Sequence, residues 1–260
     1  MLARQDDGQL AETMAASLRS AQTDSDTRSL MERLPSSGLP EHWQANDADK
    51  HVQLFDVAKS SAEYKEVHDI CGPAFVRRYE ISRLQRIQNP ALWAGYRVQR
   101  EHTKEPNEIW AVHGSVLDSL DNISANGFNR SYNGKNATLY GKGTYFAKIG
   151  NFTYSCSPLY AAPSTDGTQS IILAKVVEGK STLGTPDMVV PPYIDAATRL
   201  RYDSTTDPNG TILVTYNDYQ AYPAYFITFK PMGQPLQVCV CVCVCLRETD
   251  RERQRECVVY

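Results

Sequence analysis

The segment LYGKGTYFA, residues 139–147, sets two glycines on either side of a lysine and leads directly into a β-prone aromatic run. It does not fit the usual nucleotide-binding fingerprints. A dinucleotide fingerprint needs glycine where Phe146 stands, and a Walker loop needs Ser or Thr where Gly143 follows Lys142. The segment is therefore typical of a glycine turn that feeds a buried strand, with Tyr145 near the start of that strand.

The composition is that of a globular protein. The 260 residues are 42% hydrophobic, enough for a core, and the formal net charge is -3. Charges of both signs are interspersed, so nothing indicates direct nucleic-acid binding. No apolar run reaches the length of a membrane span and no signal-peptide pattern opens the chain. We therefore expect an intracellular protein, of the nucleus or the cytoplasm, with no membrane anchor.

Cysteine and histidine patterns give no sign of a disulfide framework or a metal site. Of the seven cysteines, only Cys71 and Cys156 lie ahead of residue 239. Two scattered thiols fit a reducing compartment. The five histidines show no H-E-x-x-H spacing, and no C-x-x-C pair accompanies them. We predict no structural or catalytic metal.

The composition changes along the chain and divides it into three segments. Residues 1–37 form a polar leader that we expect to be disordered. Residues 38–232 form one domain. Residues 233–260 form a low-complexity tail in which Cys and Val alternate strictly, as in a translated TG repeat. A strand there would place its thiols on one face, so a soft-metal site is the alternative to an appendage with no role in the chemistry.

Capping signals predict two helices early in the domain. Ser60 with Glu63 forms a capping-box pattern, and the helix that it starts should end at Gly72-Pro73. Ser115 is placed to cap a second helix, which Gly127 should end. Strands are predicted over residues 79–90, 108–115, 170–177, 211–216 and 222–229. Early helices and later strands indicate an α+β fold with a mostly antiparallel sheet.

Five motifs follow one another along this domain: VHGS (112–115), LYGKGTYFA (139–147), YSCSPLY (154–160), RYDST (201–205) and YNDYQAYPAYFITF (216–229). In this order they resemble the catalytic domain of the poly(ADP-ribose) polymerase superfamily, the diphtheria-toxin-like ADP-ribosyltransferases, in its mono-ADP-ribosylating branch. The resemblance covers about residues 38–232 and includes LPEHW (39–43) and RLQRIQNPALW (83–93). It implies a split, mostly antiparallel β-sheet with a few flanking helices, and NAD as co-substrate.

The resemblance also implies roles for particular residues in holding NAD. His113 would hydrogen-bond a ribose hydroxyl of the adenosine half, with Ser115 assisting at the same ribose. Gly114 would present its backbone N–H and C=O to the nicotinamide carboxamide, which satisfies both ends of a planar amide. Tyr145 and Tyr160 would stack on the two faces of the nicotinamide ring.

The resemblance singles out two further positions, Ser155 and Ile212. Ser155 would complete the carboxamide's hydrogen bonds, although Thr153 and Ser157 in the same segment are alternatives. Ile212 stands where chain-elongating polymerases carry glutamate, so the catalytic set reads His113, Tyr145 and Ile212. Isoleucine cannot act as a general base toward the attacking sugar hydroxyl, which argues against polymer growth.

The resemblance implies a mono-ADP-ribosyltransferase that releases nicotinamide and modifies a protein side chain, with this chain itself as one candidate acceptor. Breaking the nicotinamide–ribose bond resembles glycoside hydrolysis and depends mainly on positioning and charge stabilisation, so single transfer survives the loss of glutamate. The alternative is a catalytically inactive module of the same fold that binds NAD or ADP-ribose.

Overall fold

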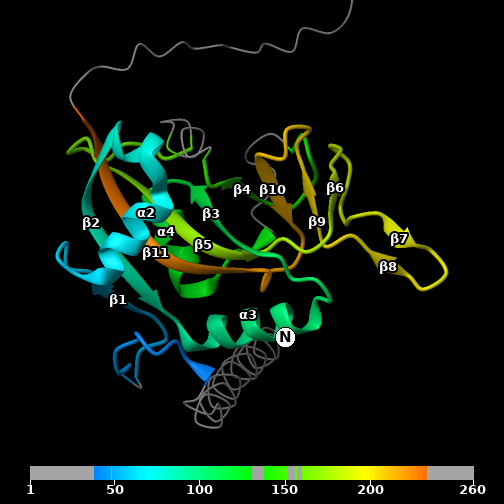
Figure 1. The fold of residues 1–260 in the computed structure, drawn as a ribbon, viewed down its shortest axis with the longest axis horizontal. Coiled ribbons are helices and arrows are strands. Elements are labelled where there is room, and N and C mark those ends of the chain that lie inside the picture. The colour runs from blue at the N-terminus through cyan, green and yellow to red at the C-terminus, as the bar shows by residue number, and fades with distance from the viewer. Residues whose placement is uncertain (1–37, 48, 131–137, 151–155, 157–159, 233–260) are drawn as a thin grey trace, which may run out of the picture.

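The computed structural model describes residues 38–47, 49–130, 138–150, 156 and 160–232 (Figure 1). The predicted leader over residues 1–37 and the Cys-Val tail over residues 233–260 lie outside the described residues. So do Ser155 and its two alternatives, Thr153 and Ser157.

A nine-stranded sheet forms the centre of the described domain, in the order β1-β2-β11-β5-β3-β4-β10-β9-β6. Among the described pairs of this sheet, β6 and β9 run parallel and the others are antiparallel. The predicted α+β fold with a mostly antiparallel sheet is confirmed. In sheet order the strands are β1 (Gln53–Asp56), β2 (Tyr79–Gln88), β11 (Ala221–Pro231), β5 (Gln169–Val177), β3 (Glu108–Gly114), β4 (Thr144–Lys148), β10 (Ile212–Thr215), β9 (Ser204–Thr206) and β6 (Ser181–Leu183). A separate hairpin of β7 (Tyr193–Asp195) and β8 (Leu200–Arg201) projects from the body as an arm (Figure 1).

β5 and β11 lie in the middle of the sheet because both faces of each strand are apolar. Every residue of β5 except Lys175 is buried, and β11 is buried from Ala221 to Ile227. Pro223 cannot donate a ladder hydrogen bond. It lies in the first part of β11, before Tyr225, and this part pairs with β5 alone. The register with β5 shifts between Pro223 and Tyr225. The predicted strands at 170–177 and 222–229 are confirmed within two residues at each end.

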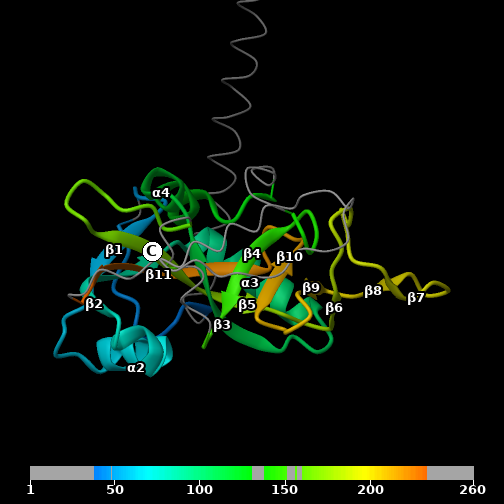
Figure 2. The same ribbon diagram turned by 90° about the horizontal axis from the view of Figure 1, so that it is seen from above.

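Helices cover both faces of the sheet. α2 (Ala62–Val76) and α3 (Pro90–His102) share one core cluster, to which they contribute Val67, Phe75 and Tyr96. α4 (Leu117–Asn126) buries Leu120 in a second cluster. Figure 2 shows α4 and α2 on opposite sides of the sheet. Each face of the sheet is thereby shielded from water by at least one helix.

The start and end of α2 differ from the prediction. Ser61, rather than Ser60, is the N-cap, and its Oγ accepts a hydrogen bond from the Tyr64 N–H at 3.0 Å. Glu63 therefore does not complete a capping box, and its carboxylate binds elsewhere. The predicted end at Gly72 is a kink, with φ 75° and ψ 167°, after which the helix resumes.

Two other boundaries also differ. Ser115 does not cap α4, because Val116 occupies the N-cap position and makes no side-chain capping bond. Gly127 ends that helix as predicted, at φ 78°. The predicted strand at 79–90 stops at Gln88, because the Asn89 side chain accepts from the Leu92 N–H at 3.2 Å and starts α3, which was not predicted.

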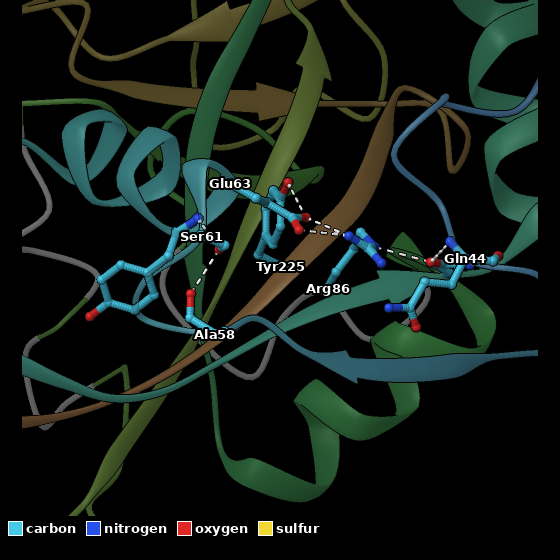
Figure 3. Close-up of polar contacts among 8 residues, drawn as sticks. Gln44, Ala58, Ser61, Glu63, Arg86 and Tyr225 are labelled. Carbon is cyan, nitrogen blue, oxygen red and sulfur yellow. Dashed lines mark hydrogen bonds and ion pairs between the residues drawn. The ribbon is translucent and has the colours of Figure 1, made fainter.

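A buried polar network fastens α2 to the sheet (Figure 3). Arg86 of β2 is 5% exposed, and its Nη1 lies 2.8 and 2.7 Å from the two carboxylate oxygens of Glu63. The Tyr225 hydroxyl of β11 donates to the same carboxylate at 3.1 Å. Arg86 Nε also donates to Gln88 Oε1 at 3.0 Å, which accepts the Gln44 N–H at 2.9 Å. The network thus joins the first turn of α2, two strands and the segment that enters the domain.

Candidate functional site

Three neighbouring strands carry the predicted catalytic residues. His113 is next to last in β3, Tyr145 is the second residue of β4, and Ile212 is the first residue of β10. β4 pairs with both β3 and β10. Residues from three distant parts of the sequence are therefore brought to one region of the sheet.

The sheet opens between β3 and β4 at His113. These two strands are in register only at Ala111 and Val112. Beyond Val112 the imidazole itself bridges them, with its Nδ1 2.9 Å from the Tyr145 carbonyl oxygen. β3 and β4 nevertheless belong to one nine-stranded sheet.

The contact with Tyr145 fixes the tautomer of His113. A carbonyl oxygen can only accept, so Nδ1 carries the proton and Nε2 of the neutral ring is an acceptor. The rings of Phe128 and Phe146 lie 5.4 and 5.7 Å from the imidazole, centroid to centroid. Burial lowers the pKa of His113 below 6.5, and the hydrogen bond to the Tyr145 carbonyl offsets this only in part. At neutral pH the site presents an uncharged imidazole.

The glycine turn holds the side chain of Tyr145. The Tyr145 hydroxyl donates to the Gly141 carbonyl at 2.8 Å and accepts from the Tyr140 N–H at 2.9 Å, so the side chain folds back onto its own turn. Gly141 has φ 125°, which side chains rarely adopt. A Cβ at Gly143 would lie 2.2 Å from the Thr215 carbonyl oxygen, so β4 and β10 need a glycine there to approach. Burial raises the pKa of Tyr145 to about 12, which keeps the phenol protonated.

Ile212 brings an aliphatic side chain to the strand beside Tyr145. It is opposite Ala147 and Val214 is opposite Tyr145, so Ile212 is the diagonal neighbour of Tyr145 on the same face. Its N–H donates to Asp207 Oδ1 at 2.7 Å. The position offers the site no side-chain acceptor or base.

Asp207 does not replace the missing carboxylate. It accepts from the Thr211 N–H at 2.6 Å, the Thr211 hydroxyl at 2.9 Å and the Asn209 N–H at 3.3 Å, besides the Ile212 N–H. Burial favours its neutral form, but these hydrogen bonds outweigh burial and lower its pKa. The carboxylate is committed to the loop that joins β9 to β10.

Two of the remaining predicted residues, Gly114 and Ser115, lie at the end of β3. Gly114 is the last residue of β3, in register with Ile171 of β5, and Ser115 follows it, half-buried. Tyr160 is half-buried. Ser155 lies outside the described residues. The structure thus describes every predicted site residue except Ser155.

Gln169, which the sequence did not single out, anchors the chain next to Tyr160. Its Nε2 donates to the carbonyl oxygens of Ala161 at 2.6 Å and Cys156 at 3.1 Å. Gln169 begins β5, two residues ahead of the partner of Gly114. One buried amide therefore ties the chain on both sides of residues 157–160 to the end of the sheet where Gly114 lies. A buried glutamine opening an apolar strand is the signal that could have identified it.

Two other features are absent from the described part of the chain. No group of three His, Cys, Asp or Glu side chains there is arranged to hold a metal ion. Among the described helices, none has the length and apolar character needed to cross a membrane.

Comparison with known sequences gives matches over most of the domain. Residues 61–231 match the family model described as Poly(ADP-ribose) polymerase catalytic domain. Protein mono-ADP-ribosyltransferase PARP14 of Homo sapiens is 34% identical over 223 residues, which are 80% of this chain and 12% of that protein. PARP10 of Mus musculus is 35% identical over 59% of this chain and 16% of its own length. PARP12 of Homo sapiens is 28% identical over 76% of this chain and 28% of its own length. The chain therefore spans well under a third of each of these relatives.

Proposed function

Because this chain belongs to the poly(ADP-ribose) polymerase catalytic-domain family, we propose that it is an NAD-dependent protein mono-ADP-ribosyltransferase. Its relatives PARP14, PARP10 and PARP12 are named protein mono-ADP-ribosyltransferases. The observation that carries the proposal is the bond between His113 and the Tyr145 carbonyl across the opening in the sheet, with Ile212 on the next strand.

The described residues fit NAD as co-substrate. NAD supplies an ADP-ribosyl group joined to a neutral leaving group, nicotinamide. A neutral His113 with Nε2 as acceptor suits a ribose hydroxyl, which is a donor. Gly114, at the end of β3, would offer its backbone to the carboxamide. The rings of Tyr145 and Tyr160 would enclose the pyridine, with each stacking contact worth about 0.5–1.5 kcal/mol beyond burial.

Ile212 supports transfer of a single ADP-ribose unit. Growth of a polymer requires a group that polarises the attacking ribose hydroxyl, and neither Ile212 nor the committed carboxylate of Asp207 supplies one. A carboxylate acceptor would bring its own negative charge to the reaction. We therefore propose Asp and Glu side chains of proteins, this chain among them, as acceptors.

We also propose that the protein works inside the cell, in the nucleus or the cytoplasm. Cys71 and Cys156 are both free and buried. Burial raises the pKa of each thiol well above its usual range. Inert reduced thiols are typical of a reducing compartment.

The test is incubation of the full chain with labelled NAD, followed by mass spectrometry of the modified residue. One discrete labelled band, lost in His113→Gln and kept in His68→Gln, a histidine of α2 whose side chain is 43% exposed, supports the proposal. A ladder of long products would disprove single transfer. No incorporation by a chain that still binds a nicotinamide analogue would show an inactive binding module instead.

A further inference from the structure

We propose that Tyr216 is a positioning residue that orients the ring of Tyr145 through the backbone of Tyr140 and Gly141. This inference rests on the proposed function, in which Tyr145 forms one wall of the nicotinamide site. Tyr216 directly follows β10 and belongs to the motif YNDYQAYPAYFITF.

The backbone of Tyr140 is held from two sides. On one side, its N–H donates to the Tyr145 hydroxyl at 2.9 Å. On the other, its carbonyl accepts from Thr205 Oγ1 at 2.7 Å and from the Tyr216 hydroxyl at 3.3 Å. The two hydroxyls also lie 2.8 Å apart, and because each carries one proton, they supply two of these three hydrogen bonds at a time. The Tyr140 backbone is therefore held by Tyr145 of β4 on one side, and by Thr205 of β9 and Tyr216 on the other.

The turn has little room to move within this arrangement. A Cβ on Gly141 would lie 1.8 Å from the Tyr216 hydroxyl oxygen. A Cβ on Gly184 would lie 2.0 Å from the Tyr140 carbonyl oxygen, so the chain after β6 packs against the same peptide. The Lys142 N–H donates to the Met188 carbonyl at 2.7 Å, which holds the far side of the turn. The Tyr216 hydroxyl thus both bonds to the turn and fills the space beside it.

The position of the turn determines that of the Tyr145 side chain. The Tyr145 hydroxyl makes both of its bonds to consecutive residues of the turn, Tyr140 and Gly141. If the Tyr216 hydroxyl is removed, the Tyr140 carbonyl keeps only Thr205, and space opens beside Gly141. The phenol of Tyr145 keeps its two bonds to the turn, but the turn is then held less firmly, and the orientation of the ring changes with it. Residues that do not touch the ligand commonly hold the side chains that do in one orientation.

A double-mutant cycle in the full chain tests the inference, with calorimetric binding of 3-aminobenzamide as one readout. Tyr216→Phe should weaken binding by about 3- to 10-fold, the usual cost of one hydrogen bond. Tyr145→Phe should weaken it similarly, and the double variant should be no weaker than Tyr145→Phe alone, because both changes break one chain of contacts. Thr205→Val should act in the same direction. Tyr96→Phe removes a buried hydroxyl bonded to Glu108 and should leave binding unchanged.

A second readout needs no ligand. In protein carrying ring-labelled tyrosine, the NMR signals of Tyr145, assigned with Tyr145→Phe, should shift in Tyr216→Phe and stay in place in Tyr96→Phe. Unchanged Tyr145 signals, or additive losses in the binding cycle, would overturn the inference. A wild-type chain that binds no analogue would instead overturn the proposed function, and the NMR comparison would still decide whether Tyr216 positions Tyr145.

Discussion

Replacing Glu63 with Leu should destabilise the domain strongly without altering the candidate site. The change leaves the Arg86 guanidinium, 5% exposed, with no counter-charge, and it removes the hydrogen bonds from Arg86 at 2.8 and 2.7 Å and from the Tyr225 hydroxyl at 3.1 Å. Breaking one side of a buried ion pair costs about 3–5 kcal/mol of unfolding free energy. For a domain of this size about 1 kcal/mol corresponds to roughly 2–4 °C, so the melting temperature should fall by about 10 °C. Urea denaturation and calorimetry of the full chain measure both quantities.

The controls separate burial from charge. Arg83 and Asp56 form a pair of similar geometry, at 2.7 and 3.1 Å, but their side chains are 57% and 64% exposed. Asp56→Leu should therefore cost at most about 1 kcal/mol. Combining Glu63→Leu with Arg86→Met should restore most of the stability, because no buried charge is left unpaired. Equal costs for Glu63→Leu and Asp56→Leu, or no recovery in the double variant, would refute this reasoning.

Three further predictions concern the site. Because burial lowers the pKa of His113, the unfolded chain binds a proton at this residue more readily than the folded chain does. The free energy of unfolding should therefore fall as the pH drops below about 6.5. Urea denaturation between about pH 7.5 and 5 should show a smaller fall for His113→Gln than for the wild-type chain. Tyr160→Ala should weaken binding of a nicotinamide analogue by about 1–3 kcal/mol in calorimetry, since one stacking wall is lost; an unchanged affinity would show that another residue forms this wall. Gln169→Leu removes the bonds to the Ala161 and Cys156 carbonyls, and it should raise the KM for NAD more than it lowers kcat; an unaltered KM would mean that this anchor does not serve the site.

The sequence predicted best those elements that depend on burial or on local stereochemistry. β5 and β11 were found because a continuous apolar run suits a strand covered on both faces. The turn at Gly141 was found because its backbone conformation needs glycine. The sequence did not predict α3, because Pro90 is compatible both with the end of a strand and, together with Asn89, with the start of a helix. The short polar strands β6 to β9 carry no apolar period to detect.

In the candidate site too, the sequence predicts some features and not others. The resemblance predicted His113, Tyr145 and Ile212 as site residues, and the structure places them on three neighbouring strands. Which atoms meet could not be read from the sequence, because the pairing of strands far apart in the chain sets it. The bond from His113 to the Tyr145 carbonyl, which determines the imidazole's tautomer, depends on where β3 and β4 separate. Gln169 was missed for a related reason, since a lone polar residue beside an apolar run does not reveal which carbonyls it will bind.

The place of β11 in the sheet has a consequence for how the protein is made. β11 is the last strand along the described chain, yet it lies between β2 and β5. While a ribosome is still translating residues ahead of Ala221, the β1-β2 pair and the strands around β5 are two separate pieces, each with an open edge able to pair with other chains. Joining them requires a contact between residues about 140 positions apart in sequence, such as Arg86 with Tyr225. Until β11 is available, these open edges leave the nascent domain prone to pairing with other chains.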